Sequence, residues 1–190
     1  MESKAKHKII VALDVPSLER AQELAALLRD AAGAFKVGKQ LFTRYGPQAI
    51  TMIHEQGGRV FLDLKFHDIP NTGAGAAVGA VEQGVHIFNV HALGGKEMME
   101  KTVAAVTKAA QEAALPPPII LAVTVLTSLN DEDLKRMGFN CSASELTVRL
   151  ARLALDSGVS GVVASAHDIS NIRKACGDDF IIVTPGIREV

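Results

Sequence analysis

The stretch VFLDLKFHDIPNT, residues 60–72, decides how this chain folds. Its first seven residues are mostly apolar and β-prone, which is typical of a buried strand. Side chains of a strand alternate between two faces, so Phe61, Asp63 and Lys65 share one face and the apolar residues between them share the other. The apolar face predicts packing against helices. The opposite face carries an acid and a base close to the end of the strand.

Two charged side chains on a buried strand require a physical reason. Burying a charge is costly unless the charge is paired. One interpretation is a structural ion pair between Asp63 and Lys65 that closes the end of a barrel. The other is an electrostatic site in which carboxylates hold an ammonium charged and aimed. Asp68 adds a third ionisable group within six residues at the strand exit, and this concentration favours the second interpretation.

The rest of the chain alternates between short apolar strands and amphipathic helices, a pattern that predicts parallel βα units. Strands are expected over residues 8–14, 35–38, 60–66, 86–91, 119–125, 159–164 and 180–184. Helices are expected over residues 16–30, 47–56, 74–83, 96–113, 144–157 and 167–176. Polar side chains recur at or just past the strand ends, namely Asp14, Lys36, Asp63, Lys65, His91, Thr127 and Arg188.

Two closures of such a sheet are possible, an open doubly wound sheet or a (β/α)₈ barrel. Barrel enzymes place catalytic groups at the C-terminal ends of several strands, and no G-x-G-x-x-G turn follows the first strand. We therefore predict the α/β class and a TIM barrel, with residues 1–190 forming a single domain. Only seven strands are readable where a barrel needs eight. We expect residues 1–190 to lack the C-terminal βα unit of the barrel. We also expect the natural protein to continue past Val190.

Composition narrows the possible partners and the compartment. The 190 residues are 48% hydrophobic and 22% charged with a net charge of −1, so no global field attracts nucleic acid or a membrane surface. Cys141 and Cys176 have no paired spacing, which favours a reducing compartment and predicts a cytoplasmic protein. No apolar run approaches the ~20 residues of a transmembrane helix.

Several motifs together resemble the orotidine 5′-phosphate decarboxylase family. The pattern D-x-K-x-x-D-I-P-x-T spans Asp63 to Thr72. Further matches, in the family's order, are L-D at 13–14, K-V-G at 36–38, N-V-H-A-x-G-G at 89–95, V-T-x-L-T-S at 123–128 and V-T-P-G-I-R at 183–188. The resemblance covers nearly the whole chain and implies decarboxylation of orotidine 5′-monophosphate to UMP in de novo pyrimidine biosynthesis, by a carbon–carbon lyase that uses neither cofactor nor metal.

The resemblance also implies a role for each matching residue. Lys65 is the expected general acid that protonates C6 of the pyrimidine, and Asp63 sits beside the substrate carboxylate. Lys36 contacts the ribose and Asp63. Asp14 is expected to bind ribose hydroxyls, Thr127 to contact the ligand, and Arg188 to lie in or near the loop over the phosphate. Asp68 and Thr72 are both expected to reach the active site of the neighbouring subunit in a homodimer. The family's later Gly-Arg pair is not found in residues 1–190, so this stretch is expected to bind phosphate poorly and turn over slowly.

The implied chemistry agrees with the residues. Loss of CO₂ leaves a carbanion in the plane of the ring, and no cofactor signature that could act as an electron sink is present. An ammonium held at C6 by flanking carboxylates can stabilise that charge and then deliver a proton. Two rival functions remain, a metal-dependent sugar-phosphate decarboxylase or aldolase on a similar barrel, and a barrel that binds nucleotide without reaction. The Ile69-Pro70-x-Thr72 continuation argues against the first.

Other polar and small residues receive structural interpretations. Lys65 competes with a metal ion for the carboxylates of Asp63 and Asp68, which argues against a metal site there. His91 is more typical of a hydrogen-bonded core residue than of a ligand, and His67 is expected in a loop. The glycine-rich run 73–79 predicts close packing at a subunit interface rather than a phosphate cradle.

Overall fold

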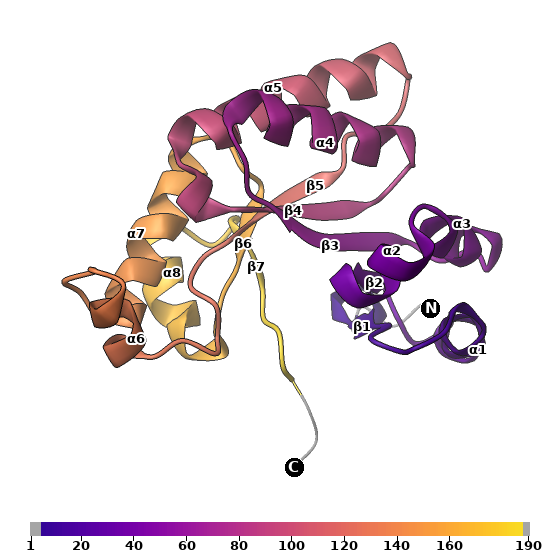
Figure 1. Cartoon of the computed structure of the whole chain (residues 1–190), viewed down its shortest axis with the longest axis horizontal. Coiled ribbons are helices and arrows are strands. Elements are labelled where there is room, and N and C mark those ends of the chain that lie inside the picture. Colours follow the sequence, from indigo (N-terminus) through magenta and orange to yellow (C-terminus); the bar gives the residue numbers. More distant parts are fainter. Residues whose placement is uncertain (1–4, 188–190) are drawn as a thin grey trace.

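The computed structural model describes residues 5–187, which form an α/β fold around one parallel sheet. The strands are β1 (Ile10–Ala12), β2 (Ala34–Gly38), β3 (Val60–Phe66), β4 (Ile87–His91), β5 (Ile119–Val123), β6 (Gly161–Val163) and β7 (Ile181–Val183). They lie in the sheet in the order in which they occur in the chain, and each pairs in parallel with the next. The curled sheet with its alternating helices confirms the predicted barrel architecture (Figure 1). An eighth strand is not among the described residues.

Helices connect successive strands and cover one face of the sheet. They are α1 (Leu18–Leu28), α2 (Lys39–Tyr45), α3 (Gln48–Glu55), α4 (Pro70–Glu82), α5 (Lys96–Glu112), α6 (Asp131–Arg136), α7 (Ala143–Asp156) and α8 (Ile169–Cys176). Short 3₁₀ helices span Lys6–Lys8, Ala92–Gly94 and Ala166–Asp168. The helix predicted from residue 74 begins four residues earlier, because Pro70 occupies the first helical turn, where a missing N–H costs nothing. The sequence prediction missed α2, which follows β2 directly.

The two faces of the sheet bury different sets of side chains. Phe61, Ile87 and Leu121 form a small cluster inside the curl, with partly buried residues of β1, β6 and β7 packed against it. The outer face carries the main core; Leu62, Phe88 and other strand residues there pack with helical side chains. The alternation predicted for β3 is therefore confirmed as far as Asp63. It directs the polar residues at the strand ends into the curl and the apolar ones under the helices.

Within the described part of the chain, no helix combines the length and the apolar character that crossing a membrane requires.

Candidate active site

A cavity of about 720 Å³ opens at the end of the sheet where the strands finish. Its walls are apolar side chains from β1, β5, β6 and β7, together with residues 185–187. Its polar lining consists of Asp14, Lys36, Asp63, Lys65, Asn89 and Thr127. A mostly apolar pocket with a few convergent polar groups is the usual form of a small-molecule site. The carboxyl ends of parallel strands bring these residues together from positions far apart in the sequence.

Four charged side chains in the cavity alternate in sign. The Lys36 ammonium lies 3.1 Å from Oδ1 of Asp14 and 3.3 Å from Oδ2 of Asp63. The Lys65 ammonium donates a hydrogen bond of 2.6 Å to Oδ1 of Asp63. Exposure falls towards the middle of this row, from 55% for the Asp14 side chain to 13% for Asp63. Each charge therefore has a partner of opposite sign, which offsets the desolvation that an isolated buried charge would suffer.

The Asp63 carboxylate is the centre of this row. Burial by itself would raise the pKa of Asp63, but hydrogen bonds from Lys65 and Asn89 and the positive charges of Lys65 and Lys36 outweigh burial, so the net pKa lies below the usual value. Asp63 is consequently ionised at neutral pH. A fixed negative charge then holds the two ammonium groups in place.

The backbone of β3 departs from regular strand geometry where it carries Lys65. The pairing with β4 shifts register between Leu62 and Phe66, so that β3 carries extra residues opposite Asn89. Lys65 itself has a φ of 53°, a left-handed conformation that costs a residue with a side chain about 1–2 kcal/mol. Bulges of this kind re-aim a side chain beside functional sites. Here the backbone at Lys65 leaves the regular strand conformation, and the lysine side chain lines the cavity beside Asp63.

Asn89 on β4 holds this irregular segment. Its Oδ1 accepts a hydrogen bond of 2.8 Å from the Lys65 backbone N–H, and its Nδ2 donates one of 2.7 Å to Oδ1 of Asp63. The side chain is 1% exposed. Asn89 thus replaces the strand partner that the bulge removes, and it fixes Asp63 at the same time. The motif match at 89–95 begins at Asn89, but no role was predicted for its side chain.

The other predicted site residues divide into two groups. Thr127 lines the cavity, as expected for a ligand contact. Asp68 and Thr72 are exposed and do not line it, and Oδ1 of Asp68 accepts a hydrogen bond from the Ile69 N–H. Arg188 lies outside the described residues. The structure therefore brings together Asp14, Lys36, Asp63, Lys65 and Thr127, whereas Asp68 and Thr72 are not part of the lining of this chain's own cavity.

His67 and His91 form a contact that the sequence did not predict. Their rings stack with centroids 5.1 Å apart, and Nδ1 of His91 accepts a hydrogen bond from the Leu93 N–H. Burial, aided by the positive charges of His67, Lys65 and Lys39, lowers the pKa of His91 to about 4. His91 is neutral at pH 7 and does not line the cavity, which agrees with its interpretation as a hydrogen-bonded structural residue.

Histidine, cysteine and acidic side chains do not gather in groups of three or more that could hold a metal ion anywhere in residues 5–187.

Comparison with known proteins places this site in a family. The family model described as "Orotidine 5'-phosphate decarboxylase / HUMPS family" matches residues 7–190. The chain belongs to this family. In this member of the orotidine 5′-phosphate decarboxylase / HUMPS family, the alternating row is formed by the same motif residues from which the resemblance was inferred. The sequence prediction of the family is therefore confirmed.

Curated relatives carry the name of the decarboxylase. The chain is 62% identical over 182 residues to orotidine 5′-phosphate decarboxylase of Syntrophus aciditrophicus, covering 95% of this chain and 72% of that protein. It is 54% identical to the enzyme of the same name from Moorella thermoacetica, covering 97% and 73%. A crystal structure of orotidine 5′-phosphate decarboxylase from Lactobacillus acidophilus superposes with a TM-score of 0.86 at 37% identity, covering 95% of this chain and 81% of that one.

Proposed function

We propose that this chain catalyses the decarboxylation of orotidine 5′-monophosphate to UMP, a step of pyrimidine biosynthesis. The observation that carries the proposal is the alternating row Asp14, Lys36, Asp63 and Lys65 at the mouth of the barrel. Curated relatives at up to 62% identity that are named for this reaction support it. The two free cysteines among the described residues, Cys141 and Cys176, favour a cytoplasmic location.

The proposed reaction needs only the charges of the site. The bond between C6 and the carboxylate breaks, CO₂ leaves, and the electron pair stays on C6 in the plane of the ring. The Lys65 ammonium stabilises this charge and transfers its proton to C6, giving UMP. Because Asp63 and Asn89 already fix Lys65, little reorganisation accompanies the development of charge, and preorganised electrostatic groups of this kind are the strongest source of rate enhancement.

The remaining residues bind the nucleotide in this proposal. Asp63 lies beside the substrate carboxylate, and Lys36 contacts the ribose while holding Asp63. Asp14 binds ribose hydroxyls from the more exposed end of the row, and Thr127 fixes the ligand from the opposite wall. The role that the family resemblance implies for Arg188, near the loop over the phosphate, lies outside the described residues. The apolar lining from β5, β6 and β7 excludes water from the ring.

We expect the protein to release one CO₂ for each orotidine 5′-monophosphate, with no loss of rate in EDTA. The absorbance change of the pyrimidine ring and trapped CO₂ measure the reaction. Loss of activity in EDTA that added Mg²⁺ restores would favour the metal-dependent sugar-phosphate enzymes on similar barrels. Binding of UMP without any release of CO₂ would identify a nucleotide-binding protein instead of an enzyme.

We also propose that the active sites are shared across a homodimer, with Asp68 and Thr72 completing the site of the neighbouring subunit. Three features support this. Both residues are exposed and do not line this chain's cavity. Ile69 beside them is 67% exposed. A Cβ added at Gly75 or Gly79 of α4 would meet nothing within 4 Å, so packing within the chain does not demand these glycines, whereas close approach of a second subunit would.

Mixing an Asp68→Ala chain with a Lys65→Ala chain tests the shared site. Each variant alone should be nearly inactive. A heterodimer contains one site with both wild-type groups, so random exchange should restore about a quarter of the wild-type activity. Differently tagged chains, recovered together, show whether exchange has occurred. Persistent inactivity of mixtures that have exchanged subunits would contradict the sharing of Asp68.

A further inference from the structure

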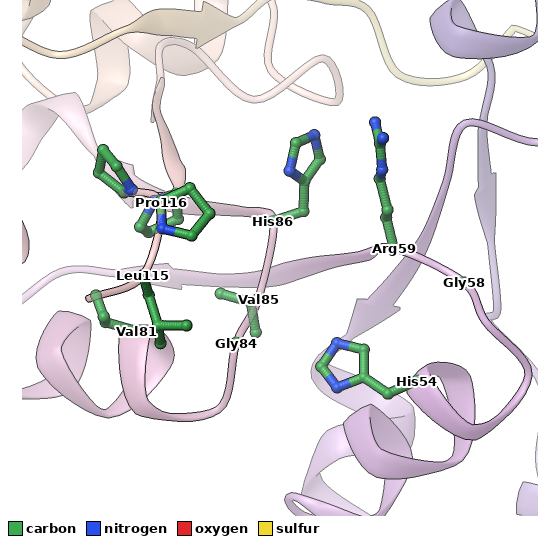
Figure 2. A pocket seen from close by; sticks show the side chains of 11 residues that line it. His54, Gly58, Arg59, Val81, Gly84, Val85, His86, Leu115 and Pro116 are labelled. Carbon is green, nitrogen blue, oxygen red and sulfur yellow. The ribbon is translucent and has the colours of Figure 1, made fainter. Parts of the chain in front are cut away.

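A second cavity, of about 500 Å³, lies at the opposite end of the barrel from Lys65, where the strands begin. Figure 2 shows Arg59 and His86 extending side by side from the residues that precede β3 and β4, with His54 nearby at the end of α3. The remaining lining is almost wholly apolar and comes from Val81, Val85, Leu115 and the proline run 116–118. The proposed reaction uses none of these residues.

The charged groups of this cavity are all cationic or capable of becoming so. Arg59, His54 and His86 come from different segments, and neither aspartate nor glutamate is among the lining residues. Within residues 5–187 the Arg59 side chain makes neither an ion pair nor a side-chain hydrogen bond. Burial, together with the positive charge of Arg59, lowers the pKa of His86. The lining of the cavity therefore carries the positive charge of Arg59 and unused hydrogen-bond donors.

The C-terminal ends of neighbouring helices offset part of this positive charge but leave the donors of Arg59 unused. α3 and α4 finish at this cavity, and the partial negative charge of a helix C-terminus attracts cations. This attraction explains why an arginine is tolerated here. However, no terminal carbonyl of these helices accepts a hydrogen bond from Arg59 in the described part of the chain, so the guanidinium retains its donors for a ligand.

We propose that this cavity binds a phosphate monoester that carries an aromatic or aliphatic body. The planar guanidinium of Arg59 and the imidazole of His86 offer donors side by side, which suits a phosphate with several acceptor oxygens, and His54 adds a second imidazole to the lining. The wall of Val81, Val85, Leu115 and prolines 116–118 accommodates the apolar body. The prolines also stiffen the rim, so a ligand loses little affinity to ordering of the protein. The site is distinct from the cavity around Lys65.

Titration with phenyl phosphate tests the site through the two histidines. Carbon–proton NMR signals of the His54 and His86 rings report on this end of the barrel, independently of any binding near Lys65. We expect both signals to shift and saturate, with inorganic phosphate binding at least about tenfold more weakly because it has no apolar body. Sodium chloride at matched ionic strength serves as the blank. Absence of shifts at concentrations up to about 10 mM would overturn the proposal, and so would equal affinity for inorganic phosphate.

A matched pair of variants separates the site from general charge. Arg59→Gln should weaken phenyl phosphate binding at least about tenfold, because it removes the charged donor that faces the ligand. Arg149→Gln removes the same charge from the exposed surface of α7 and should leave binding unchanged. Both variants should keep the decarboxylase activity, which shows that they fold. Arg59→Gln binding as tightly as the wild type would contradict the assignment.

Discussion

Lys65→Ala is expected to lower kcat for decarboxylation by about 10⁴-fold or more, with the fold retained. The reason is that this residue supplies both the positive charge next to C6 and the proton that C6 receives. The other ammonium of the row, that of Lys36, lies between Asp14 and Asp63 and does not take its place. Steady-state kinetics measures the loss. Circular dichroism and thermal unfolding confirm the fold. Lys135→Ala, on the exposed surface of α6, is the matched control and should remain fully active. Near-normal turnover in purified Lys65→Ala would end the proposed mechanism.

A second variant at the same position separates catalysis from backbone strain. Lys65 has a φ of 53°, which glycine adopts freely and alanine does not. Lys65→Gly and Lys65→Ala both lack the ammonium, so their difference in free energy of unfolding reports the strain at this φ, reduced by the extra chain entropy of glycine in the unfolded state. We expect the glycine variant to be more stable than the alanine variant by about 1 kcal/mol, although both are inactive. Equal or lower stability of the glycine variant in urea unfolding would show that the strain does not exceed the entropy cost of glycine in the unfolded chain.

Asn89→Ala is expected to damage stability and catalysis together. It leaves the buried Lys65 N–H without an acceptor and removes a donor from Asp63, which should lower the free energy of unfolding by about 1–3 kcal/mol. The ammonium of Lys65 and the carboxylate of Asp63 then move relative to the substrate, so kcat should fall by about 10²-fold with a much smaller change in KM. Denaturant unfolding and steady-state kinetics measure the two effects.

Asn171→Ala provides the matched control for this variant. Asn171 is exposed on α8, and its amide makes one long hydrogen bond of 3.4 Å to Ser144. The control should change stability and kcat little. Asn89→Ala with unchanged kcat and unchanged stability would show that Asn89 does not position the row. A loss of stability with unchanged kcat would restrict Asn89 to a structural role.

The pattern of residues predicted much of this architecture, because the strands and helices of parallel βα units differ clearly in their hydrophobic periodicity. Period-two alternation in β3 identified the inner and outer faces, and the core confirms it. The acidic run at 131–133 forms the first turn of α6, with Asn130 as its cap. Short elements were harder to predict. α2 follows β2 without an intervening turn, and no break in composition marks its beginning.

The sequence by itself determined the chemistry of the candidate site. Asp63 and Lys65 are charged groups on one otherwise apolar strand, and the cost of burying them unpaired predicts that they meet. The contact between Lys36 and Asp63 was implied by the family resemblance. Only the tertiary structure decided how they are held. The shifted register between β3 and β4, the φ of 53° at Lys65 and the two hydrogen bonds of Asn89 all depend on contacts between strands. Such contacts leave no periodic trace in the chain, because the partner that stabilises a strained residue lies 24 positions away.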